Sequence, residues 1–226
     1  AVLSLLLMAS GCGESEAPEQ DVSDSGTLVI QENEPVAGWL EVVLPGSPVA
    51  IDGFGENVWI LTDTGTAMGW NASGEGWSSI EAAGAFDIAV GDRSVAILSH
   101  EDLTVYENGE MTELTFQESQ VPLSVCSTEE GPAILFQDGT VEVCREGSLS
   151  VAQESSGVEA FGELSCDDGL MAWMNETGTA SILQIDEGLV TETSLPEGTS
   201  SIALSGGLLL VTGEDGTTSS LEENTW

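Results

Sequence analysis

The sequence predicts an all-β protein, a β-propeller built from four-stranded antiparallel blades. A pattern of apolar stretch, acidic turn and second stretch occurs five times, with copies starting at Val58, Val95, Ala133, Met171 and Leu209. These starts lie 37, 38, 38 and 38 residues apart (95−58, 133−95, 171−133, 209−171). So regular a spacing indicates one small unit stacked on copies of itself.

Each copy has the composition of two strands joined by a tight turn. Its apolar runs of four or five residues, rich in Val, Ile, Leu and Trp, are too short for helices. Turn signals such as Thr64-Gly65 and Asp138-Gly139 separate the runs, and glycine supplies the positive φ that a hairpin needs. A further strand follows each hairpin, and another precedes it, centred on Ile51, Ile88, Val125, Leu164 and Ile202. Four strands in about 38 residues predict a propeller blade.

The phase of the repeat sets the domain boundaries within a propeller domain at residues 27–226. Four full blades are expected, at residues 48–84, 85–120, 121–160 and 161–198. Partial blades are expected at residues 27–47 and 199–226. Two ring sizes stay open: a five-bladed ring closed by an N-terminal strand, or a fragment of a larger propeller.

The N-terminal residues predict export. Residues 1–9 are apolar, too short to span a bilayer as a helix and suited to the hydrophobic region of a secretory signal. Two small residues then precede Cys12, with Ala9 where Leu is usual, and this arrangement resembles the lipobox of bacterial lipoproteins. The resemblance implies a signal peptide at residues 1–11 and a lipid on Cys12. An ordinary signal peptide with a chance cysteine is the alternative.

The charge of the chain excludes several partners. Residues 12–26 are acidic and lack aromatic residues, which predicts a flexible tether. The whole chain has 40 Asp and Glu against two Arg, a formal net charge of −38. Such a surface repels nucleic acid and anionic lipid headgroups, so we expect no nucleic-acid partner and membrane contact through the lipid alone. Salt near about 1 M would screen the self-repulsion, which favours a saline habitat.

No residue pattern in the sequence points to catalysis, a metal or a cofactor. His100 is the only histidine and is expected in a polar hairpin turn, without a Ser-His-Asp or Cys-His arrangement around it. No cysteine pair spaced by two residues offers a zinc site. Paired carboxylates of the glycosidase type stay open, but 40 candidates give no means of choosing two.

The cysteines and two tryptophans are the remaining candidate site residues. Cys126 and Cys166 occupy similar places in neighbouring blades, whereas Cys144 ends a third strand. A disulfide between Cys126 and Cys166 is preferred to one with Cys144, because bonded cysteines need Cα atoms within about 7 Å. Three free thiols are the alternative. Trp70 and Trp77 flank a loop, where they either stack on a ligand or pack in the core.

Residues 61–77 carry a family resemblance. Thr64-Gly65-Thr66, Trp70-Asn71 and Gly74 match the repeat of the regulator of chromosome condensation propellers. The chain resembles that repeat in one blade, while its period is shorter and the family's histidine is absent. The resemblance implies only a propeller architecture. A broader similarity is to lipid-anchored propellers of bacterial envelopes, which serve as docking platforms or assembly factors.

Two functions follow as hypotheses. The first is an exported, lipid-anchored propeller that acts as a non-catalytic binding or scaffold module in the bacterial cell envelope. It would face the periplasm or the exterior and bind an unknown envelope protein or glycan. The alternative is an exported propeller enzyme that acts on polysaccharide through paired carboxylates.

Overall fold

The computed structural model describes residues 2–6, 39–71, 76–167 and 169–221. Every regular element in these ranges is a β-strand, and every strand pairing is antiparallel. The structure is a five-bladed β-propeller arrangement with four strands in each blade and three in the last, which confirms the predicted fold class. Among the described residues, no helix is long and apolar enough to cross a membrane.

We number the blades 1 to 5 in chain order and give their strands from the inside outward. Blade 1 comprises β3 (Pro48–Phe54), β4 (Asn57–Thr62), β5 (Thr66–Asn71) and β6 (Gly76–Glu81). Blade 2 comprises β7 (Ala85–Val90), β8 (Ser94–Ser99), β9 (Asp102–Glu107) and β10 (Glu110–Thr115). Blade 3 comprises β11 (Pro122–Thr128), β12 (Gly131–Phe136), β13 (Val141–Arg145) and β14 (Ser148–Gln153). Blade 4 comprises β15 (Ala160–Asp167), β16 (Leu170–Asn175), β17 (Thr179–Gln184) and β18 (Leu189–Ser194). Blade 5 comprises β19 (Thr199–Ser205), β20 (Leu208–Gly213) and β21 (Thr218–Ser220).

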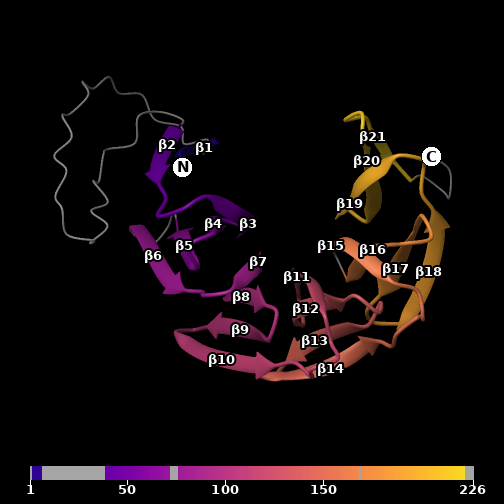
Figure 1. The fold of residues 1–226 in the computed structure, drawn as a ribbon, viewed down its shortest axis with the longest axis horizontal. Coiled ribbons are helices and arrows are strands. Elements are labelled where there is room, and N and C mark those ends of the chain that lie inside the picture. Colours follow the sequence, from indigo (N-terminus) through magenta and orange to yellow (C-terminus); the bar gives the residue numbers. More distant parts are fainter. Residues whose placement is uncertain (1, 7–38, 72–75, 168, 222–226) are drawn as a thin grey trace.

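The blades stand side by side around a common centre. The inner strands β3, β7, β11, β15 and β19 line this centre, while β10, β14 and β18 lie at the rim (Figure 1). Each inner strand contacts the next one along the series. The described arc is open between blade 1 and blade 5 (Figure 1).

At the N-terminal end, the described residues form one short strand pair. β1 (Val2–Leu6) pairs antiparallel with β2 (Trp39–Val43). β21 pairs with β20, so no described N-terminal strand lies beside blade 5. Cys12, the predicted tether at 12–26 and residues 27–38 of the first partial blade lie outside the described residues.

The predicted hairpin turns have the expected backbone. Gly65 and Gly139 have φ values of 74° and 81°, in the left-handed region that favours glycine. Blade 2, whose turn lacks glycine, uses a side chain instead. Ser99 Oγ accepts hydrogen bonds from the backbone N–H groups of Glu101 and Asp102, at 3.1 and 3.0 Å. A hydroxyl thus closes the turn that glycine closes in other blades.

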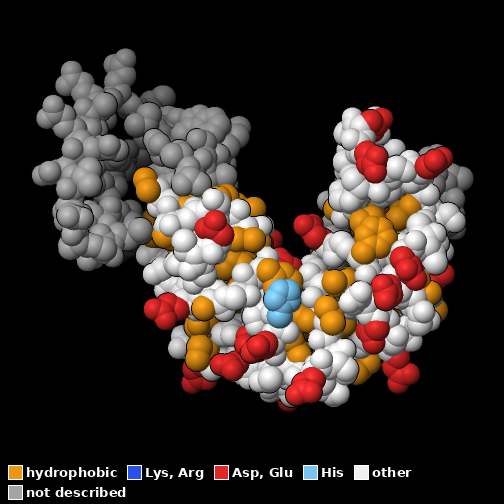
Figure 2. Space-filling view, in the orientation of Figure 1, with side chains coloured by type: hydrophobic (Ala, Val, Ile, Leu, Met, Phe, Trp, Pro, Cys, Tyr) orange, Lys and Arg blue, Asp and Glu red, His pale blue; other side chains and the backbone are white. Residues whose placement is uncertain are grey.

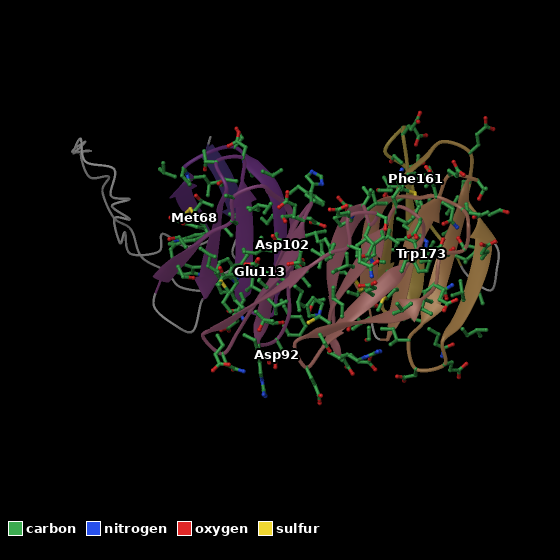
Figure 3. The ribbon with its side chains drawn as sticks, turned by 60° about the horizontal axis from the view of Figure 1, so that its bottom comes forward. Met68, Asp92, Asp102, Glu113, Phe161 and Trp173 are labelled. Carbon is green, nitrogen blue, oxygen red and sulfur yellow. A yellow bond between two sulfur atoms is a disulfide. The ribbon has the colours of Figure 1, made fainter. Side chains whose placement is uncertain are left out.

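The core lies between neighbouring blades. The residues at the centres of the inner strands pack against the blade before them, and their exposed fractions are 3% for Ile88, 5% for Val125, 5% for Leu164 and 7% for Ile202. Trp173, 2% exposed, fills the core between blades 3 and 4 (Figure 3). The corresponding residue of blade 1, Ile51, is 50% exposed.

Candidate functional site

Two carboxylates link inner strands of neighbouring blades. The backbone N–H of Val90 in blade 2 donates to Asp52 Oδ2 in blade 1, at 2.7 Å. One junction further on, Asp87 Oδ2 accepts from the backbone N–H of Val125 and from Ser124 Oγ, both at 2.9 Å. We call each inner-strand link of this kind a latch. These carboxylates therefore join blades rather than face a ligand freely.

The next two junctions are latched by different chemistry. Blades 3 and 4 are joined by a disulfide between Cys126 and Cys166, whose Cα atoms are 5.9 Å apart. This is the pair that the sequence favoured. Blades 4 and 5 are joined by Ser165 Oγ, which accepts from the backbone N–H of Leu204 at 2.8 Å. Each of the four junctions between described blades thus has a latch on its inner strand.

The two latching carboxylates resist ionisation. Loss of hydration on burial raises the pKa of Asp52, and the N–H donors of Val90 and Gly53 offset part of that rise. Burial likewise raises the pKa of Asp87, and the negative charge of Glu163 raises it further. Asp87 and Glu163 belong to blades 2 and 4, so the charge of one blade acts on an acidic group of another across the centre of the arc.

A large cavity occupies the centre of the arc. Its volume is about 1510 Å³. The inner strands β3, β7, β11 and β15 with the turns after them form most of its walls, and residues of β9, β10 and β13 complete them. One arginine, Arg93, and ten acidic side chains line it, the latter being Asp52, Asp87, Asp92, Glu107, Glu110, Glu129, Glu130, Glu146, Glu163 and Asp167. Asp92 lies at the opposite end of the blades from Phe161 (Figure 3). The cavity is therefore strongly anionic.

One wall of the cavity is apolar and accessible. Val49, Ile51 and Phe54 of β3 all line it, and each is about half exposed, at 49%, 50% and 51%. Figure 2 shows the molecule hollowed at the open side of the arc, with acidic side chains over the face in view and no Lys or Arg on it. Apolar side chains gathered in a concave surface suit a binding site.

Both arginines of the chain are paired with carboxylates. Arg93 Nε lies 3.4 Å from Asp92 Oδ2, and both side chains are exposed. Arg145 Nε donates to Glu130 Oε2 at 2.7 Å, its Nη2 donates to the same oxygen, and its Nη1 donates to Ser150 Oγ at 3.0 Å. These pairs neutralise only two of the acidic groups at the cavity.

The two predicted stacking residues lie opposite one another. Trp70 on β5 pairs with Trp77 on β6, and their ring centroids are 5.5 Å apart with the planes tilted by 46°. Trp77 also packs against the small cluster that contains Ile60 and Met68. The two rings contact each other and the blade. Their stacking on a ligand stays a prediction, and residues 72–75 of the loop between them lie outside the described part.

The other reactive side chains are dispersed. His100 stacks on Phe86, with ring centroids 4.6 Å apart. Cys144 is a buried free thiol, and burial raises its pKa. No group of three or more His, Cys, Asp or Glu side chains in the described ranges is placed to hold a metal ion.

Sequence reasoning missed the latching role of Asp52 and Asp87. In the sequence they are two of 40 acidic residues, and nothing local distinguishes them from the others. A usable signal exists: each lies on an inner strand, 38 residues before the backbone N–H that it accepts from. In both cases an acidic residue of an inner strand stands one repeat before a buried residue of the next inner strand.

Solved structures show the same fold. No protein-family model matches the chain, and no curated protein matches it in sequence. Human WBSCR16 superposes with a TM-score of 0.64 at 8% identity, over 84% of this chain and 67% of that one. The WD40 β-propeller domain of Doa1 gives 0.62 at 16% identity, over 82% and 69%. BamB from Moraxella catarrhalis gives 0.59 at 10% identity, over 82% of this chain and 61% of that one. The chain thus spans less than two thirds of BamB, and similarity at these identities shows the fold alone.

Proposed function

We propose that the protein is an exported, lipid-anchored propeller that acts as a non-catalytic binding or scaffold module in the bacterial cell envelope. The observation that carries this proposal is the central cavity. Its wall combines three half-exposed apolar side chains of β3 with ten carboxylates. Such a surface suits a partner that buries an apolar segment and presents positive charge beside it. The partner we propose is an envelope protein or glycan.

Membrane attachment in this proposal comes from the lipid on Cys12. A chain with a formal net charge of −38 gains nothing from an anionic membrane surface. The acidic segment at 12–26 would then hold the propeller away from the headgroups. The domain would face the periplasm or the exterior, where a disulfide persists.

The anchor is tested by changing one residue. The chain is expressed in a bacterial host behind an initiator methionine, with an alkyne-bearing fatty acid in the medium. Label should enter the wild type, and Cys12→Ser should be unlabelled and released from membranes. Equal labelling of both proteins would exclude the proposed anchor. Cys144→Ser is the matched control, because it removes a cysteine elsewhere.

The binding surface is tested by cross-linking from two exposed apolar positions. A photoreactive amino acid replaces Ile51 on the cavity wall or Met111 on the outer strand β10, exposed by 50% and 60%. A defined cross-linked product should form in the envelope fraction from position 51 alone, and Ile51→Asp should abolish copurification of that product's partner. The same products from both positions would count against the cavity as the binding surface.

The enzymatic alternative rests on two carboxylates, Asp87 and Glu163, which line the same cavity. Two carboxylates facing one cavity are the equipment of a glycosidase. However, Asp87 Oδ2 already accepts two hydrogen bonds, and Asp87 Oδ1 accepts one from the backbone N–H of Ile88. Proton transfer from Asp87 would disturb a blade junction, which favours binding over hydrolysis. Turnover of any glycan that Glu163→Gln abolishes would reverse this preference.

A further inference from the structure

The latches occupy one recurring position of the propeller. Asp52, Cys126 and Ser165 each pair with the residue seven places further along their own hairpin: Trp59, Ala133 and Ala172. The three residues are therefore structurally equivalent, on the inner strands of blades 1, 3 and 4. Their chemistry differs: a carboxylate, a thiol and a hydroxyl.

Their targets are equivalent as well. Val90, Cys166 and Leu204 each directly follow the equivalent position of the next blade, which is Ala89, Ser165 and Ala203 respectively. The disulfide thus replaces the hydrogen bond found at the first and fourth junctions. At the second junction, blade 2 has Ala89 at the equivalent position, and Asp87, two residues earlier on the same face, makes the link instead.

We propose that the Cys126–Cys166 disulfide is a redox-sensitive latch, whose reduction selectively loosens the junction between blades 3 and 4 and so opens one wall of the cavity. A dithiol reductant supplies two electrons and two protons. The S–S bond breaks, both cysteines become thiols, and the dithiol is oxidised to its own disulfide. This regulation goes beyond the proposed binding function and does not depend on the identity of the partner.

The junction has no second inner-strand link to replace the bond. No hydrogen bond joins β11 to β15 in the part of the chain that the structure describes. By contrast, the junction between blades 4 and 5 has two links, because Gly207 N also donates to Asp167 Oδ2 at 3.1 Å. Breaking the disulfide therefore removes the link between the two inner strands. It leaves the backbone hydrogen bond from Ala160 N, at the start of β15, to Gln137 O of blade 3, at 2.8 Å.

The bond is placed where a reductant reaches it. Both Cys126 and Cys166 line the central cavity, and Cys166 is only partly buried. Cys126 is 8% exposed, so a small dithiol would attack from the cavity at Cys166.

The third cysteine, Cys144, also lines the cavity, but it packs in a different core cluster. Cys144 belongs to the core cluster between blades 2 and 3, whereas Cys126 belongs to the cluster between blades 3 and 4. Burial also raises the pKa of the Cys144 thiol, which keeps it protonated and a poor nucleophile. The latch should therefore open and close without reshuffling to Cys144.

The test is hydrogen–deuterium exchange of the full-length chain, oxidised and after treatment with dithiothreitol. Reduction should speed amide exchange in β11, β12, β15 and β16 on the order of tenfold or more, while β7 and β8 stay unchanged. Uniform acceleration over all blades, or no change, would overturn the proposal. Cys144→Ser should respond like the wild type.

A second variant keeps the test decisive. Cys126→Ser places at this junction the residue that latches the next one, so its Oγ should accept from the backbone N–H of Cys166 as Ser165 Oγ does from Leu204. Its amide exchange rates should not change when dithiothreitol is added, and they should lie between those of the oxidised and reduced wild type. Rates at or above the reduced level would mean that the latch position has no role.

Discussion

The first and third blade junctions solve one geometric problem with different chemistry. At the first, Asp52 accepts a hydrogen bond from Val90, and at the third, Cys126 bonds covalently to Cys166. The two sites share strand position and target, so the repeat fixes where a latch stands. The side chain then decides which condition loosens it: protonation state at the first junction, redox state at the third. Four changes would break or sharpen this comparison.

Removal of the covalent latch should have the largest effect. Cys126→Ala opens a disulfide that spans 40 residues, and such a bond contributes typically 2–4 kcal/mol. We expect the free energy of unfolding of the oxidised protein to fall by about that amount, measured by urea denaturation. Wild-type protein in dithiothreitol should show a similar loss, and a variant as stable as the oxidised protein would refute the comparison.

Removal of the carboxylate latch should have a smaller effect. Asp52→Ala leaves the N–H of Val90 without its acceptor, which costs about 1–3 kcal/mol for a buried donor. The measurement is again urea denaturation, at neutral pH and in high salt. Asp63→Ala is a control on the same blade, since Asp63 accepts from Ser47 N at an exposed turn. Equal losses from both variants would mean that the junction has no special weight.

Conversion of the covalent latch into a hydrogen-bonded one should recover part of the loss. Relative to Cys126→Ala, Cys126→Ser should be more stable by about 0.5–1.5 kcal/mol, the net value of one hydrogen bond. Ser165→Ala should lose about as much stability as Cys126→Ser gains over Cys126→Ala. This comparison checks that both hydroxyls act alike. A serine no better than alanine would contradict the shared geometry.

The smallest expected effect is a difference between the two junctions in how stability depends on pH. A carboxyl whose folded pKa is raised adds stability that is complete below its unfolded pKa near 3.8 and is lost as pH rises through the folded pKa. Asp52→Asn removes this titration, and its Oδ1 can still accept from Val90. The stability of Asp52→Asn relative to wild type should therefore rise as pH increases above 3.8. Thermal melts of both proteins over a range of pH measure this difference. Cys126→Ser should show no such trend.

The repeat in the sequence was enough to predict the fold. Strand centres at Ile51, Ile88 and their counterparts follow from spacing alone. The equivalent places of Cys126 and Cys166 favoured a disulfide between them but left three free thiols open as the alternative. The spacing did not predict that Ile51 is half exposed while Ile88 is buried, because exposure depends on which blade lies in front. Equivalent residues in a repeat share a backbone, and their burial is set by their neighbours.

The candidate site was less accessible to sequence reasoning. The cavity draws side chains from four blades, so no local motif encodes it. Asp52 and Asp87 were hidden by the 40 acidic residues around them, since composition does not separate a buried acceptor from a solvated charge. Trp70 and Trp77 were identified as neighbours of one loop, and the antiparallel register that sets them face to face comes from the structure.

The disulfide also has a mechanical consequence. When the chain is pulled from its two ends, the residues between Cys126 and Cys166 cannot extend while the bond is intact. The separation of 40 residues corresponds to roughly 130–140 Å of extended chain. An oxidised molecule under force should therefore have a total contour length shorter by that amount. The segment from β12 to β15 would stay unextended while the other blades unfold and lengthen.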